Sequence, residues 1–152
     1  MLIIHSVEEF LQLSKMPLGI SEWLVIDQPL INRFAEATLD FQWIHVDTRR
    51  IQKESTYGTP IAHGYLVLSL IPHFLNSIIE IRGGDRIVNY GIEKMVFQAP
   101  VPVGSRLRMK AFLKSARDLG NICLANIQCE FEIEGKKDPV LVGSIRYLYY
   151  FK

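Results

Sequence analysis

The stretch DFQWIHVD, residues 40–47, places two acids around one histidine. Asp40 and His45 are five positions apart in a segment whose composition is typical of a loop, so local geometry can bring both side chains to one point. A carboxylate and an imidazole that face one water molecule form a base and a proton donor at neutral pH. The pattern therefore indicates acid–base chemistry on water, with Asp40 as the base and His45 as its partner.

The same residues permit two other interpretations. Asp40 could be a turn residue at a helix end and His45 a partly buried histidine, while Asp47 is expected to be the N-cap of the helical turn TRRIQKES. A metal site would need a third and a fourth ligand. The cysteines lie on a different element, and the other histidines have no ligand spacing; these are His5, His63 and His73. No metal is therefore expected.

A second informative stretch is IAHGYL, residues 61–66, in which Gly64 opens a long apolar segment. Main-chain N–H groups at a helix start have no intrahelical acceptor, and they suit an oxyanion or a thioester carbonyl. Glycine would let a substrate carbonyl approach the main chain closely, although it could also be only a helix-entry residue. Addition or removal of water beside a carbonyl requires both this polarisation and an acid–base pair.

The elements that must position these residues can be predicted from periodicity. The run GISEWLVID contains a short strand, and Asp27 with Pro29 predicts a helix start. An amphipathic helix then ends near Leu39, so Asp40 lies just past its C-terminus. The segment between Tyr65 and Ile81 is apolar on nearly every side. Polar residues interrupt this segment, so it is expected to be a core helix with a kink or break at Pro72 rather than a membrane span.

From residue 87 onward the hydrophobic period changes to two, which predicts four strands in series as an antiparallel meander. One buried helix and one antiparallel sheet define an α+β domain, with the sheet wrapped around a long central α-helix in the hotdog arrangement. The whole chain, residues 1–152, is expected to form this single domain, with residues 1–17 as an N-terminal helical extension. Open sheet edges favour a homodimer.

Composition limits the partners. The net charge is +1 and the charges are scattered, which indicates neither a nucleic-acid nor a membrane partner. Cys123 and Cys129 lie roughly 20 Å apart along one strand, too far for a bridge, and are expected to be buried core residues. Their use fits a reducing, cytoplasmic location, and the N-terminus does not have the pattern of a signal peptide.

The segments FAEATLDFQWIHVD and GTPIAHGYLVLSLIP resemble the MaoC-like dehydratases, the (R)-specific enoyl-CoA hydratase branch of the hotdog superfamily. The segment VNYGIEKMVFQAPVPVGSRLR is similar to the family's second half. The resemblance implies that Asp40 and His45 activate one water, which adds to a trans-2-enoyl-CoA thioester and gives (R)-3-hydroxyacyl-CoA. It also implies that the Gly64 N–H polarises the thioester carbonyl. CoA or an acyl carrier protein would be part of the substrate, and no separate cofactor is implied.

The resemblance also implies an acyl-chain pocket beside the central helix, near Tyr65, Leu68, Ser69 and Asn89. Phe41 and Trp43 depart from the family pattern within the motif, so Trp43 is expected to line or narrow the pocket. Leu39 stands where the related bacterial branch has glycine, and this matters if the position requires a positive φ. These departures affect chain-length preference more than the reaction type.

Two alternative functions remain open. A hotdog acyl-CoA thioesterase would attack the carbonyl and would need a carboxylate on the central helix, where this chain has no acid before Glu80. A non-catalytic acyl-thioester-binding hotdog subunit would keep the fold and could lose the reacting pair. The presence of both Asp40 and His45 favours the hydratase.

Overall fold

The alternating sequences of the second half of the chain form a curved antiparallel sheet in the computed structural model, which describes all 152 residues. Inward-facing residues of the strands Arg106–Asp118 and Ile122–Ile133 are buried, and their outward-facing charges form cross-strand ion pairs such as Arg106–Glu134 at 2.7 Å. The predicted alternation is therefore confirmed for these two strands, whereas no residue of Gly84–Phe97 is buried. The long strands are β5 (Gly84–Phe97), β6 (Arg106–Asp118), β7 (Ile122–Ile133) and β8 (Leu141–Phe151).

The predicted strand order is wrong in one respect. Strands β6, β7 and β8 form a meander, but β5 pairs with β8 at the sheet edge and not with its sequence neighbour β6. Residues 98–105 must therefore cross from one side of the sheet to the other. Hydrophobic periodicity identifies strands but does not encode which strands pair, so the sequence pattern could not reveal this crossing.

The buried apolar segment forms two consecutive helices, α5 (Gly64–Ser69) and α6 (Ile71–Ile78). The predicted break at Pro72 is confirmed, since Pro72 occupies the first turn of α6. The predicted end of the segment is wrong, because Ile79–Ile81 form strand β4, which pairs in parallel with β1 (Leu2–Ile4). No helix of the protein has the length and apolar character needed to span a bilayer.

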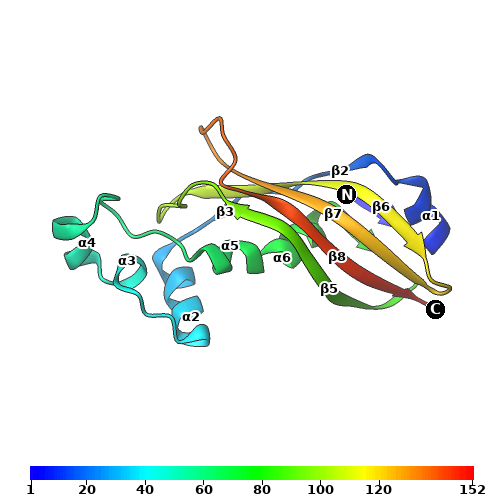
Figure 1. Cartoon of the computed structure of the whole chain (residues 1–152), viewed down its shortest axis with the longest axis horizontal. Coiled ribbons are helices and arrows are strands. Elements are labelled where there is room, and N and C mark those ends of the chain that lie inside the picture. The colour runs from blue at the N-terminus through cyan, green and yellow to red at the C-terminus, as the bar shows by residue number, and fades with distance from the viewer.

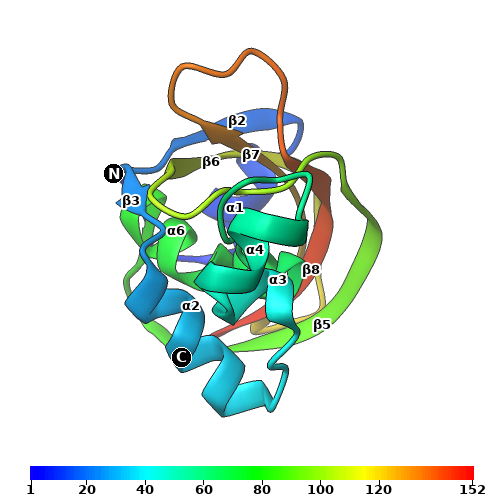
Figure 2. The ribbon, with the colours of Figure 1, turned by 90° about the vertical axis from the view of Figure 1, so that its left-hand side faces the viewer.

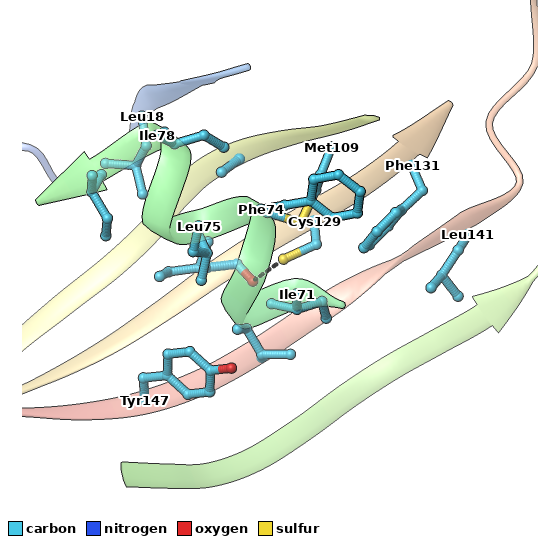
Figure 3. Close-up of a cluster of buried hydrophobic side chains, with 14 of the residues drawn as sticks. Leu18, Ile71, Phe74, Leu75, Ile78, Met109, Cys129, Phe131, Leu141 and Tyr147 are labelled. Atoms are coloured by element: carbon cyan, nitrogen blue, oxygen red, sulfur yellow. Dashed lines mark hydrogen bonds between the residues drawn. The ribbon is translucent and has the colours of Figure 1, made fainter. Parts of the chain in front are cut away.

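Helix α6 lies inside the curve of the sheet and fills the core. Phe74 packs edge-on against Phe131 of β7, with ring centroids 5.6 Å apart, and Figure 3 shows Leu75 and Ile78 on the same helix facing the sheet. Cys123 and Cys129 are free and buried, as predicted, and burial raises the pKa of each thiol to about 12.

The first residues are not a helical extension. Only α1 (Val7–Gln12) is helical, capped by Ser6, whose side chain accepts the Glu9 N–H. Strands β1 and β2 (Met16–Ile20) flank it, and β2 pairs with β6 at the second sheet edge. Phe10 is fully buried and its ring packs at a tilt against that of Tyr149, so this segment belongs to the core of the domain.

A layer of three short helices projects from one end of the sheet, as Figures 1 and 2 show. It follows β3 (Leu24–Val25), which pairs with β6. Asp27 caps the first of these helices by accepting the Leu30 N–H, as predicted. The layer consists of α2 (Gln28–Thr38), α3 (Trp43–Val46) and α4 (Thr48–Glu54).

Leu39 ends α2 in the left-handed conformation, with φ +60°, so the position does require a positive φ. This conformation costs an L-residue with a Cβ about 1–2 kcal/mol, and the Leu39 side chain is 79% exposed and contributes little packing.

We predict that Leu39→Gly raises the free energy of unfolding by about 1 kcal/mol, measured by urea denaturation. Leu39→Ala is the control, because alanine retains the Cβ. A glycine variant no more stable than the alanine variant would contradict the argument.

Candidate active site

Asp40 and His45 lie where the projecting layer turns back toward the sheet. Asp40 follows the left-handed Leu39, and half of its side-chain area is exposed. His45 does not lie in a loop as predicted, because it belongs to α3, a single helical turn, and it is buried. A ring nitrogen of His45 and a carboxylate oxygen of Asp40 lie within 4.8 Å of each other, a separation that one water molecule can bridge.

The protonation of His45 follows from its surroundings. Its Nδ1 lies 2.7 Å from the Ile61 carbonyl oxygen, which can only accept, so Nδ1 carries the hydrogen and Nε2 keeps its lone pair. Burial lowers the pKa of His45 from its ordinary value of 6.5, and this outweighs the opposing effects of the Ile61 carbonyl and Asp40. His45 is therefore neutral at physiological pH, with Nε2 able to accept a hydrogen bond from water.

The structure adds a residue that the sequence patterns did not assign to the site. His63 is 2% exposed and its ring stacks on that of His45, with centroids 3.8 Å apart and planes inclined at 26°. Its Nε2 donates to the Asp40 main-chain oxygen at 2.9 Å. In the sequence, the one sign of a role for His63 is its position beside Gly64. Its contact with Asp40 joins residues 23 positions apart along the chain, and spacing does not reveal such a contact.

Asp40, His45 and His63 place possible ligand atoms within 4.8 Å of one another. Nitrogen lone pairs lie in the plane of an imidazole ring, and two stacked rings hold them in two nearly parallel planes rather than directing them at one point. One nitrogen of each ring is also engaged with a main-chain oxygen. These contacts do not fit a tetrahedral ligand set, so the expectation of no metal is retained as a prediction.

Gly64 is the first residue of α5, as predicted, and its N–H and that of Tyr65 have no acceptor within the chain. The glycine also has a packing explanation, because a Cβ at this position would lie 2.9 Å from the ring of Phe97. His45, Gly64 and Tyr65 line one cavity of about 460 Å³, whose walls are mostly apolar. His45 and the two residues with free N–H groups therefore line one cavity.

The other predicted substrate residues lie elsewhere. Leu68, Ser69 and Asn89 line a second cavity of about 460 Å³ between α5, α6 and β5. Trp43 lines neither cavity, and the Arg50 guanidinium covers its ring at 4.4 Å. Asp47 caps α4 by accepting the Arg50 N–H at 2.9 Å, so it acts as the predicted cap.

Two solved structures share the fold. A monoamine oxidase regulatory protein from Archaeoglobus superposes with a TM-score of 0.79 at 21% identity, covering 100% of this chain and 99% of that one. An (R)-hydratase from A. caviae involved in PHA biosynthesis superposes at 0.70 with 21% identity, covering 85% and 93%. At these identities the likeness shows the fold, which is the hotdog arrangement.

The sequence comparisons show the family. The model of the MaoC like domain matches residues 9–129. A 3-hydroxyacyl-thioester dehydratase Z from Mycobacterium tuberculosis is 39% identical over 147 residues, covering 95% of this chain and 97% of the relative. The chain therefore belongs to the MaoC-like domain family.

Proposed function

We propose that the protein is a hydro-lyase that adds water to trans-2-enoyl-CoA thioesters, giving (R)-3-hydroxyacyl-CoA, and that catalyses the reverse dehydration. The observation that carries this proposal is the approach of Asp40 to His45 within 4.8 Å, with His45 Nδ1 held by the Ile61 carbonyl. The names of the relatives, a 3-hydroxyacyl-thioester dehydratase and an (R)-hydratase, support the same reaction class.

The proposed mechanism uses one water between the two side chains. The water donates one hydrogen to the Asp40 carboxylate and the other to His45 Nε2, which directs an oxygen lone pair at C3 of the substrate. As the C3–O bond forms, Asp40 takes the water proton and the C2–C3 π electrons move onto the thioester oxygen. The free N–H of Gly64 stabilises this enolate. Asp40 then returns the proton to C2, so the net change is addition of one water.

A thioesterase is the main alternative enzyme. It would break the C–S bond and release a free thiol, and its carboxylate would lie on the central helix. Helices α5 and α6 carry no acid. A non-catalytic thioester-binding subunit is the alternative without chemistry, and the close approach of Asp40 to His45 favours the enzyme over it.

We predict that the purified protein removes the conjugated chromophore of a short trans-2-enoyl-CoA without releasing free thiol. Asp40→Asn should lower kcat by about 10²–10⁴-fold, because a general base contributes that much. Asp47→Asn makes the same chemical change at the carboxylate that caps α4 and should leave kcat unchanged. The measurement is absorbance of the enoyl thioester, with a thiol reagent in parallel.

Two outcomes would contradict the proposal. Thiol release in place of chromophore loss would identify a thioesterase. Near-normal hydration by Asp40→Asn would remove the role assigned to this carboxylate.

We further propose that the chain acts as a homodimer joined along β5, in the cytoplasm. Strand β5 is a sheet edge, and large apolar side chains remain exposed along it; these are Ile87, Val88, Tyr90, Ile92, Val96 and Phe97. A second β5 would satisfy the unpaired main-chain groups and cover this surface. The two buried free thiols support the cytoplasmic location.

Val88→Glu is predicted to dissociate the dimer, because it places a charge within the apolar edge. Met16→Glu is the matched control, since Met16 is an exposed apolar residue on β2 at the opposite edge of the sheet. Light scattering coupled to size-exclusion chromatography should give a monomer for the first variant and a dimer for the second. The reverse result would place the interface at β2.

A further inference from the structure

We propose that His63 is a positioning residue for the reaction, fixing the main chain of Asp40 through a hydrogen bond and the ring of His45 through stacking. The inference rests on the proposed function, since it concerns the same two side chains. His63 is not assigned a proton transfer, because its Nε2 hydrogen is donated to the Asp40 main-chain oxygen at 2.9 Å and its Nδ1 is buried.

The hydrogen bond from His63 to the Asp40 main-chain oxygen holds the turn at Asp40, which few other contacts stabilise. Asp40 lies between the left-handed Leu39 and the short helix α3, outside any regular element. Its main-chain oxygen has one hydrogen-bond partner, His63 Nε2 at 2.9 Å, and its carboxylate accepts the Gln42 N–H at the longer distance of 3.3 Å. The ring of His63 therefore ties the base to the start of the core helix α5.

The stacking contact between His63 and His45 restrains the His45 ring. The imidazole of His63 is stacked face to face with that of His45, and it also lies 5.0 Å from the ring of Phe34 on α2. The Ile61 carbonyl holds one edge of the His45 ring, and His63 covers one of its faces. Rotation of the ring away from Asp40 is opposed at both places.

The chemistry of His63 does not fit a space-filling role. Its Nδ1 is buried and has no hydrogen-bond partner, and burial of an unpaired polar atom costs free energy that an apolar side chain would avoid. His63 occupies the N-cap position of α5, yet its side chain makes no capping bond. Neither helix capping nor apolar packing therefore explains why this residue is a histidine. The hydrogen bond to the Asp40 main-chain oxygen does, because it requires the Nε2–H of the ring.

Electrostatics agree with this assignment. The titratable groups that face His45 are His63 at the start of α5 and Asp40 after α2, while Tyr57 lines the same cavity. After burial, the charge of His63 is the second influence that lowers the pKa of His45, and Asp40 opposes it. Removal of the His63 ring should therefore raise the pKa of His45 and move the acid limb of kcat/KM to higher pH, since the neutral Nε2 is the active form.

The test compares two substitutions of His63 with a control substitution of His73. His63→Leu keeps bulk but removes the donor, and it should lower kcat by about 10- to 100-fold with little change in KM, as expected for a displaced base. His63→Gln keeps a donor that can reach Asp40, and it should stay within about 5-fold of the wild-type kcat. His73→Leu, the same change at an exposed histidine of α6, should have no effect.

A second measurement does not depend on activity. NMR titration of the ¹³C-labelled histidines, assigned with His45→Asn, should show that the pKa of His45 is higher in His63→Leu and His63→Gln than in the wild type. If the wild type hydrates no enoyl thioester, the proposed function fails while this titration still tests the stacking contact. Folded His63 variants with wild-type kcat and an unchanged His45 pKa would overturn the inference. The inference would also fail if kcat of His63→Gln were as low as kcat of His63→Leu. If His63→Leu does not fold, the inference is tested by the His45 pKa and the kcat measured for His63→Gln.

Discussion

The burial of α6 inside the curved sheet is the constraint on which the rest of the structure depends. Phe74, Leu75 and Ile78 fill the concave face of β6, β7 and β8, and they fix the direction in which the helix leaves the core. Because α5 precedes α6 without a connecting loop, the same packing sets the position of Gly64 and its free N–H groups. The candidate site is therefore placed at one end of the sheet by apolar contacts at the centre of the sheet.

Polar contacts then attach the projecting helices to this rigid element. The segment before α5 is held by the crossing connection, through Ala62 N–H to the Val101 oxygen at 2.8 Å. It in turn holds the projecting layer of helices, because the Ile61 carbonyl accepts from His45 Nδ1 and His63 Nε2 donates to the Asp40 main-chain oxygen. The short sequence from Ile61 to Gly64 thus contributes a main-chain acceptor, a ring donor and free N–H groups to one site.

The sequence predicted most of the elements and that Asp40 and His45 lie close together. The alternating runs, the Asp27 and Asp47 caps and the break at Pro72 depend on local rules, and the structure confirms them. Tertiary pairing was not predictable in this way, as the placement of β5 beside β8 and the strand at Ile79–Ile81 show. His63 was missed for the same reason, since its contact with Asp40 depends on how α2 and α5 pack and not on spacing along the chain.

In the proposed reaction one water, held by Asp40 and His45, supplies both the hydroxyl group and the proton that add to the double bond. Hydration of a trans-2-enoyl-CoA in D₂O tests it directly, with the configuration at C2 and C3 of the product read by NMR. Because Asp40 both takes and returns the proton from one side of the substrate, the deuterium and the hydroxyl group should add to the same face. Addition to opposite faces, or deuterium distributed over both positions at C2, would contradict the assignment of both proton transfers to Asp40.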